Sequence, residues 1–177
     1  MIETTTKIRD ITNDEKTILL SELLNVDETY WSVHLPAILT SLREGRSIHI
    51  NFIDYDLTVV QKMNNSILFP KTLDIIKSIS NLPIGRVYWH RLLPGQKIDT
   101  HNDSGVVDRF KGKLLFRYQI YLDVPEEMEL IIDGKMVKDP KVFSNSLYHF
   151  ALQRNHYYKN NSNNPFYLLV FDFMETG

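Results

Sequence analysis

The chain has 177 residues, of which 43% are hydrophobic and 24% are charged, as in an ordinary globular protein. Its 20 basic and 22 acidic residues give a formal net charge of −2, which argues against nucleic acid or a membrane surface as a partner. There are no cysteines, so disulfides, thiolate metal sites and a cysteine nucleophile are excluded, and a reducing, cytoplasmic location is expected. Any bound metal ion must be held by His, Asp or Glu.

The first half of the sequence predicts helices around one strand. Thr12 and Glu15 form a capping box ahead of an apolar run, which is typical of a helix start. Further along, Ile48, Ile50 and Phe52 alternate with polar residues, which indicates a strand. No apolar run is long enough to span a bilayer, and the N-terminus lacks the pattern of a signal peptide. We expect helices over about 13–25, 30–45 and 69–80 and a strand over 47–56.

The second half of the sequence predicts β-structure. Short runs rich in β-branched and aromatic residues are separated by turn residues, and Asp133-Gly134 is a hairpin signal. This pattern indicates a β-sandwich, jelly roll or barrel. We therefore expect one mainly β domain over 1–177, in which a helical and mixed layer (1–82) packs outside one sheet of the β-core (83–177). The expected strands cover residues 86–93, 96–101, 113–124, 128–138, 146–152, 155–160 and 165–173.

His101 and Asp103 lie at the end of one expected strand. Side chains at i and i+2 of an extended chain share a face, so this imidazole and carboxylate could converge on one metal ion. A solvated turn with two polar residues is the alternative. His156, which precedes the final apolar strand, offers a second imidazole. Two imidazoles and one carboxylate are the facial triad that holds Fe(II) and leaves positions for a chelating cosubstrate and dioxygen.

Longer sequence blocks surround these three residues. "RLLPGQKIDTHND" contains His101 and Asp103, "RYQIYLDVP" follows it, and His156 begins an H-x3-N-x-S block before a closing "LLVFD". Over roughly residues 46–173, these blocks resemble the aspartyl/asparaginyl β-hydroxylase family. The resemblance implies a double-stranded β-helix, which is a cupin-like jelly roll, and an Fe(II)- and 2-oxoglutarate-dependent dioxygenase. It also implies that His101, Asp103 and His156 are the metal ligands and the catalytic residues.

The spacing after the distal histidine supports the choice of His156. Asn160 and Asp172 lie four and sixteen residues after it, where the family places an Asn or Gln and an Asp. His149 has neither partner, so we expect it to be structural, or at most a residue of the cavity. Asn145 stands where the family usually has glycine, and asparagine still tolerates a left-handed turn.

The cosubstrate anchor departs from the family pattern. The family carries an arginine that salt-bridges the far carboxylate of 2-oxoglutarate, and this sequence has Phe166 in that position. A dianion in a partly buried pocket needs another cation or several strong donors. Arg117 is our first choice for the anchor, with His90 and Gln119 as further cosubstrate-binding donors. The additional residues within 104–116 are expected to form a lid or a substrate loop.

The resemblance implies hydroxylation of an unactivated C–H bond, with dioxygen as co-reactant. The substrate would be an Asp/Asn-type side chain of a peptide or a small amino-acid-like molecule. One alternative is a cupin-like metalloenzyme that does not use 2-oxoglutarate, which Phe166 favours. The other is a degenerate, non-catalytic binding module of the same fold, which the intact ligand set disfavours. The sequence selects neither one substrate nor an oligomeric state.

Overall fold

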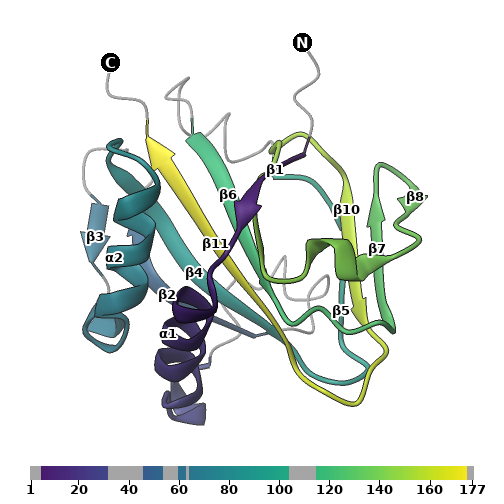
Figure 1. Ribbon diagram of the computed structural model, residues 1–177, viewed down its shortest axis with the longest axis horizontal. Coiled ribbons are helices and arrows are strands. Elements are labelled where there is room, and N and C mark those ends of the chain that lie inside the picture. The colour runs from purple at the N-terminus through teal and green to yellow at the C-terminus, as the bar shows by residue number, and fades with distance from the viewer. Residues whose placement is uncertain (1–4, 32–45, 54–59, 63, 104–114, 175–177) are drawn as a thin grey trace.

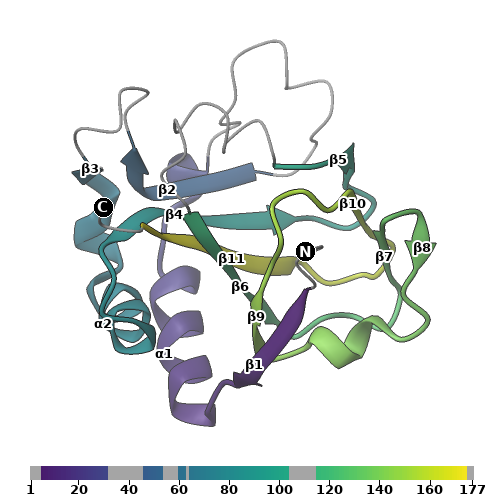
Figure 2. The same ribbon diagram turned by 90° about the horizontal axis from the view of Figure 1, so that it is seen from above.

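Two antiparallel sheets face each other, and helices cover the outer side of the larger one (Figures 1 and 2). The computed structural model describes residues 5–31, 46–53, 60–62, 64–103 and 115–174. The large sheet has the strand order β1 (Thr6–Asp10), β9 (Ser146–His149), β6 (Leu115–Leu122), β11 (Phe166–Met174), β4 (Ile84–Leu92), β2 (Arg46–Ile53) and β3 (Val60–Lys62). The small sheet has the order β5 (Lys97–His101), β10 (His156–Asn160), β7 (Met128–Ile132) and β8 (Lys135–Met136).

The residues of β4 and β11 alternate between two cores, as strand geometry requires. Trp89 and Phe171 lie on the outer face, where they are fully buried in one core with residues of α1 (Asn13–Leu24) and α2 (Pro70–Ile79). Tyr88 and Leu168 belong to a second core between the sheets, which also contains Tyr158 of β10. The central strands are therefore covered by helices on one side and by the small sheet on the other, and apolar side chains contribute to a core on each side.

Side chains cap both helices at their N-termini. The Thr12 side chain accepts a hydrogen bond from the backbone N–H of Glu15, and the Glu15 carboxylate accepts one from the N–H of Thr12, which completes a capping box. At α2, the carboxylate of Glu22 from α1 accepts hydrogen bonds from the backbone N–H groups of Lys71 and Thr72, both at 2.8 Å. One carboxylate thus joins the two helices and complements the positive end of the α2 dipole.

The expected fold class is confirmed, because the protein is mainly β, has two facing sheets and carries its helices outside one of them. The turn expectations are also confirmed. Asp133 and Gly134 adopt φ angles of 50° and 73° between β7 and β8, as a tight hairpin requires. Asn145 adopts the left-handed conformation, with φ of 52°.

Several elements differ from the expectation. β1 was not expected, and its residues are mostly exposed, so no apolar alternation marks it in the sequence. It forms because it pairs with β9 at the edge of the large sheet. Among the described residues, the other additions are β3 and the short 3₁₀ helices η1 (Glu28–Tyr30), η3 (Asn64–Leu68) and η4 (Pro140–Phe143).

Two expectations fall largely outside the described residues. Most of the helix expected over 30–45 lies there, and so does most of the insertion over 104–116. Within the part of the chain that the structure describes, no helix combines the length and the apolar character needed to cross a bilayer.

Candidate metal centre

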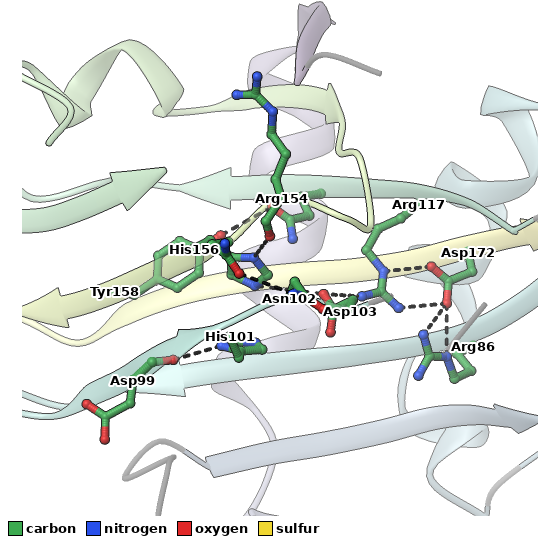
Figure 3. Close-up of polar contacts among 12 residues, drawn as sticks. Arg86, Asp99, His101, Asn102, Asp103, Arg117, Arg154, His156, Tyr158 and Asp172 are labelled. Atoms are coloured by element: carbon green, nitrogen blue, oxygen red, sulfur yellow. Dashed lines mark hydrogen bonds and ion pairs between the residues drawn. The ribbon is translucent and has the colours of Figure 1, made fainter. Parts of the chain in front are cut away.

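His101, Asp103 and His156 meet between β5 and β10 (Figure 3). His101 ends β5, Asp103 follows it closely, and His156 opens β10. The two strands pair so that the histidines are direct partners, with ring centroids 4.2 Å apart. His156 Nε2 lies 3.7 Å from Asp103 Oδ2, and the three potential ligand atoms all lie within 4.8 Å of one another. The register of one strand pair therefore brings residues that are distant in sequence into a single ligand set.

Backbone carbonyls fix the tautomer of both imidazoles. His101 Nδ1 lies 2.8 Å from the carbonyl oxygen of Asp99, and His156 Nδ1 lies 2.9 Å from that of Arg154. A carbonyl oxygen only accepts hydrogen bonds, so each Nδ1 carries the proton and each Nε2 carries the lone pair that a metal ion needs. Metal-binding histidines are held in this way, with the second nitrogen donating to a carbonyl or carboxylate.

A pocket between the two sheets opens onto the three candidate ligands. Its wall combines apolar side chains with polar ones. No lysine or arginine belongs to the described lining of this pocket. Besides the candidate ligands, the lining consists of Tyr88, His90, Ile98, Gln119, Tyr158, Leu168 and Val170.

A hydrogen-bonded cluster orients Gln119 at the pocket wall. The hydroxyl of Tyr121 donates to Gln119 Oε1 at 2.5 Å, and the hydroxyls of Tyr121 and Tyr158 are 3.2 Å apart. Burial raises the pKa of Tyr121 well above its usual range, so this hydroxyl keeps its proton at neutral pH. Because Oε1 is the acceptor in this cluster, the Gln119 amide NH₂ is the group that can donate to a ligand in the pocket.

A row of alternating charges lies beside Asp103 (Figure 3). Arg117 Nη1 is 2.5 Å from Asp103 Oδ2, and Arg117 Nε and Nη2 donate to the two oxygens of Asp172 at 2.8 and 3.1 Å. Arg86 Nε donates to Asp172 Oδ2 at 2.9 Å. Burial raises the pKa of Asp172, and the positive charges beside it oppose that shift by stabilising the ionised carboxylate. The side chains of Arg117 and Asp172 are both 0% exposed.

The structure places the expected cosubstrate-binding residues in two different environments. His90 and Gln119 line the pocket. Arg117, the expected anchor, is not part of the lining, because it lies directly opposite Asp172 in the β6–β11 pairing and its guanidinium is held between two carboxylates. Phe166 is 2% exposed and packs within the apolar core between the sheets.

His149 and Asn160 lie away from the candidate ligands. His149 ends β9 and packs against the ring of Tyr118, at a centroid distance of 5.4 Å, on the side of the sheet that faces the helices. Asn160 ends β10, the strand that His156 opens. Its amide donates to the carbonyl oxygens of Leu92 and Asn164, so it organises the turn into β11.

Sequence reasoning missed Arg86 and the tyrosine pair around Gln119. A signal for Arg86 was present, because residues at i, i+2 and i+4 of a strand share a face and Arg86 is thus aligned with Tyr88 and His90. A charged residue on the inner face of an apolar strand requires a buried counter-ion.

Comparisons with solved structures support the architecture. An oxidoreductase of the 2OG-Fe(II) oxygenase family from Burkholderia pseudomallei has a TM-score of 0.64 and 14% identity, with 96% of this chain and 84% of that chain covered. A prolyl hydroxylase from Trichoplax adhaerens, solved with a hypoxia inducible factor peptide fragment, has a TM-score of 0.60 and 15% identity, covering 96% and 83%. A Pseudomonas putida prolyl-4-hydroxylase has a TM-score of 0.59 and 16% identity, covering 99% and 95%. At these identities the likeness establishes the fold.

Family assignment comes from the sequence itself. No curated protein matches the chain. The family model for aspartyl/asparaginyl beta-hydroxylases matches residues 42–176, about three quarters of the 177 residues, and this span contains the candidate ligands and the strands that position them. The chain belongs to the aspartyl/asparaginyl β-hydroxylase family.

Proposed function

We propose that this protein is an Fe(II)- and 2-oxoglutarate-dependent dioxygenase that hydroxylates an unactivated C–H bond. The observation that carries the proposal is the set of two imidazoles and one carboxylate, His101, Asp103 and His156, gathered at a pocket between two sheets. These donors fit the ion, because two neutral imidazoles and a carboxylate occupy one face of Fe(II). When bound, iron together with 2-oxoglutarate and dioxygen supplies the oxidising chemistry, which no side chain of the protein can supply alone.

The protein's own residues would hold the metal ion and shield the reaction from water. His101 and His156 would each present Nε2 to the ion, since a backbone carbonyl holds the opposite ring nitrogen. The ring of Phe150 packs edge-on against His156, at a centroid distance of 5.0 Å, and restricts its rotation. His156 itself is only 3% exposed, so water has little access to that side of the site.

We propose that the far carboxylate of 2-oxoglutarate is held by several neutral or weakly basic donors. Phe166 replaces the expected arginine, and no lysine or arginine belongs to the described pocket lining. Besides the candidate ligands, the polar residues in the described lining are His90, Gln119, Tyr88 and Tyr158. Several donors acting on one carboxylate can offset its desolvation, which a single neutral donor cannot do.

The substrate would be a peptide side chain or a small amino-acid-like molecule, with dioxygen as co-reactant. Both prolyl hydroxylases described above are structural neighbours, and one of them was solved with a peptide fragment. The family is named for aspartyl and asparaginyl hydroxylation, which supports an Asp/Asn-type side chain. We also propose a cytoplasmic location, which the absence of cysteine supports.

The decisive experiment is the decarboxylation of 2-oxoglutarate labelled at C1 by protein that has been loaded anaerobically with Fe(II). We expect label release that requires both iron and dioxygen. His156→Ala should abolish tight metal binding and label release, because two ligands cannot hold the ion. His149→Ala is the matched control and should retain both, since His149 packs against Tyr118 outside the pocket.

Each outcome separates the candidate functions. Equal loss in His149→Ala would show that the distal ligand is wrongly assigned. Tight metal binding without any binding of 2-oxoglutarate would favour a cupin-like metalloenzyme with another chemistry. With label release established, incubation with peptides rich in Asp, Asn or Pro, followed by mass spectrometry for one added oxygen atom, would identify the substrate class.

A further inference from the structure

We infer that Arg117 is a positioning residue for the metal ligand Asp103, and that Asp172 and Arg86 hold it in that role. This inference rests on the metal site of the proposed function, and it assigns to Arg117 a task other than anchoring 2-oxoglutarate. The observation that carries it is the division of the guanidinium between two carboxylates. One edge, Nε and Nη2, forms a two-bond fork with Asp172, and the remaining nitrogen, Nη1, lies 2.5 Å from Asp103 Oδ2.

The fork with Asp172 fixes the plane of the Arg117 guanidinium. Two parallel hydrogen bonds to one carboxylate define both the position and the orientation of a planar group. Asp172 is in turn fixed by Arg86, whose Nε and Nη2 lie 2.9 and 2.8 Å from its Oδ2. With both of its oxygens engaged by arginines, Asp172 serves as a counter-ion and has no role as a metal ligand.

Asp103 is the only member of this row that also belongs to the ligand set. It follows β5 and has its backbone N–H bonded to the carbonyl oxygen of Leu152 at 2.8 Å, which fixes its main chain. Its side chain is 13% exposed and would rotate about χ1 and χ2 without a partner. The contact with Arg117 restrains the carboxylate beside the histidines before any ion is present.

The charges of the row explain why it is stable in the interior. Asp103, Arg117, Asp172 and Arg86 alternate in sign, so each charge of the row has an opposite charge beside it. Removing any member of the row leaves the charge of its neighbour less compensated. The effect on Asp103 should weaken with each step along the row, because Arg117 touches it directly, Asp172 acts through Arg117, and Arg86 acts through both.

Anaerobic metal titration of Arg117→Met, Asp172→Asn and Arg86→Met tests this inference, with Co(II) as the probe ion so that its visible spectrum reports the ligand geometry. We expect Arg117→Met to lower the affinity by roughly tenfold to a hundredfold, as is typical when the group that orients a ligand is lost. Asp172→Asn should have a smaller effect, and Arg86→Met the smallest. Arg117→Lys, which keeps the charge but lacks the fork, should restore part of the affinity and of the Co(II) spectrum.

Arg91→Met is the matched control. Arg91 also lies on β4, its side chain is 9% exposed, and it pairs with Glu28 and stacks on Trp31, without any contact to the row. This change should lower stability and leave metal affinity and the Co(II) spectrum unaltered. Metal affinity that is equal in wild type and Arg117→Met would overturn the inference, as would equal losses in the Arg117 and Arg91 variants.

Titration of 2-oxoglutarate into metal-saturated protein distinguishes this role from that of the anchor. We expect metal-saturated Arg117→Met to bind 2-oxoglutarate about as well as wild type. Unchanged metal affinity with lost 2-oxoglutarate affinity would identify Arg117 as the anchor and refute the positioning role. Graded losses of metal affinity would support the positioning role even if 2-oxoglutarate failed to bind the wild type, a result that would refute only the proposed function.

Discussion

On its outer face, the large sheet presents Trp89, Ile120 and Phe171 to the helix layer, and all three are fully buried apolar side chains. On its inner face, neighbouring positions of the same strands carry Gln119 and Asp172, which are equally buried but polar. A strand sends successive side chains to opposite faces, so one backbone builds both surfaces. Within one sheet, the residues that stabilise the fold and the polar residues near the candidate metal site therefore lie on opposite faces. They alternate along each strand, one residue apart.

The most direct test of this difference between the two faces is a substitution that affects the outer face alone. Phe171→Ala removes a fully buried ring that stacks on Tyr118 at a centroid distance of 5.7 Å. We expect the free energy of unfolding to fall by about 3–5 kcal/mol, the range for truncation of a buried aromatic residue. Denaturant unfolding measures this loss of stability. Metal titration at low temperature measures the metal affinity of the protein that remains folded. Loss of metal affinity in protein that remains folded would contradict the separation of the two faces.

A second test concerns the small sheet, at the end of β10 that is away from His156. Asn160 is fully buried, and its side chain bonds Leu92, Asn164 and Ser162. Asn160→Ala should lower the free energy of unfolding by about 1–3 kcal/mol, because buried carbonyl and hydroxyl groups lose their partners. Metal affinity should stay at the wild-type level, since the residue organises a turn. A drop in affinity larger than the stability loss explains would place Asn160 in the metal site after all.

The smallest expected effect is a pH-dependent change in stability caused by the Arg9–Glu15 ion pair at the start of α1. The Arg9 guanidinium, which bonds both oxygens of Glu15 at 2.7 and 2.6 Å, holds the pKa of that carboxyl below its usual range. A depressed folded-state pKa stabilises the fold above the unfolded value of about 4.3, and this stabilisation is lost as pH falls through the folded value. Glu15→Gln should therefore lower stability at neutral pH by up to about 1 kcal/mol, since Arg9 is partly exposed.

The measurement is urea unfolding of wild type and Glu15→Gln between pH 7 and pH 3. The two proteins should approach each other in stability towards the acid end of this range, because protonation of the wild-type carboxyl progressively removes the charge that Arg9 stabilises. A constant difference across the range would mean that the capping geometry, and not the charge, carries the effect. Metal affinity at neutral pH should be the same in both proteins.

Much of the fold could be predicted because it depends on local patterns. The alternation in β4 and β11, the capping box at Thr12 and the Asp133-Gly134 turn each encode structure within a few residues. β1 escaped prediction because its residues are mostly exposed, and only its pairing with β9 defines it as a strand. Strands at the edge of a sheet bury little, so they carry little apolar signal.

The candidate site could also be predicted only where it depends on local sequence patterns. His101 and Asp103 could be selected as candidate ligands because they lie two residues apart at the end of an expected strand, and the resemblance to a known family then supported His156. The surroundings of Arg117 could not be found in this way. Its partners depend on the register of β6 against β11, in which it lies opposite Asp172, and on a register shift between Phe171 and Phe173 in the β4–β11 pairing. The register of two strands depends on tertiary packing, so it cannot be read from a single sequence.

The position of β11 has a consequence for the order in which the molecule assembles. It is the last strand among the described residues, yet it occupies the centre of the large sheet and pairs with β4 on one side and β6 on the other (Figure 1). Until β11 docks, β4 and β6 have no common partner, and Arg86 and Arg117 lack the carboxylate that neutralises them. Such long-range pairing slows folding, because large loops must close first. The row of charges beside Asp103 is therefore complete only once β11 has docked between β4 and β6.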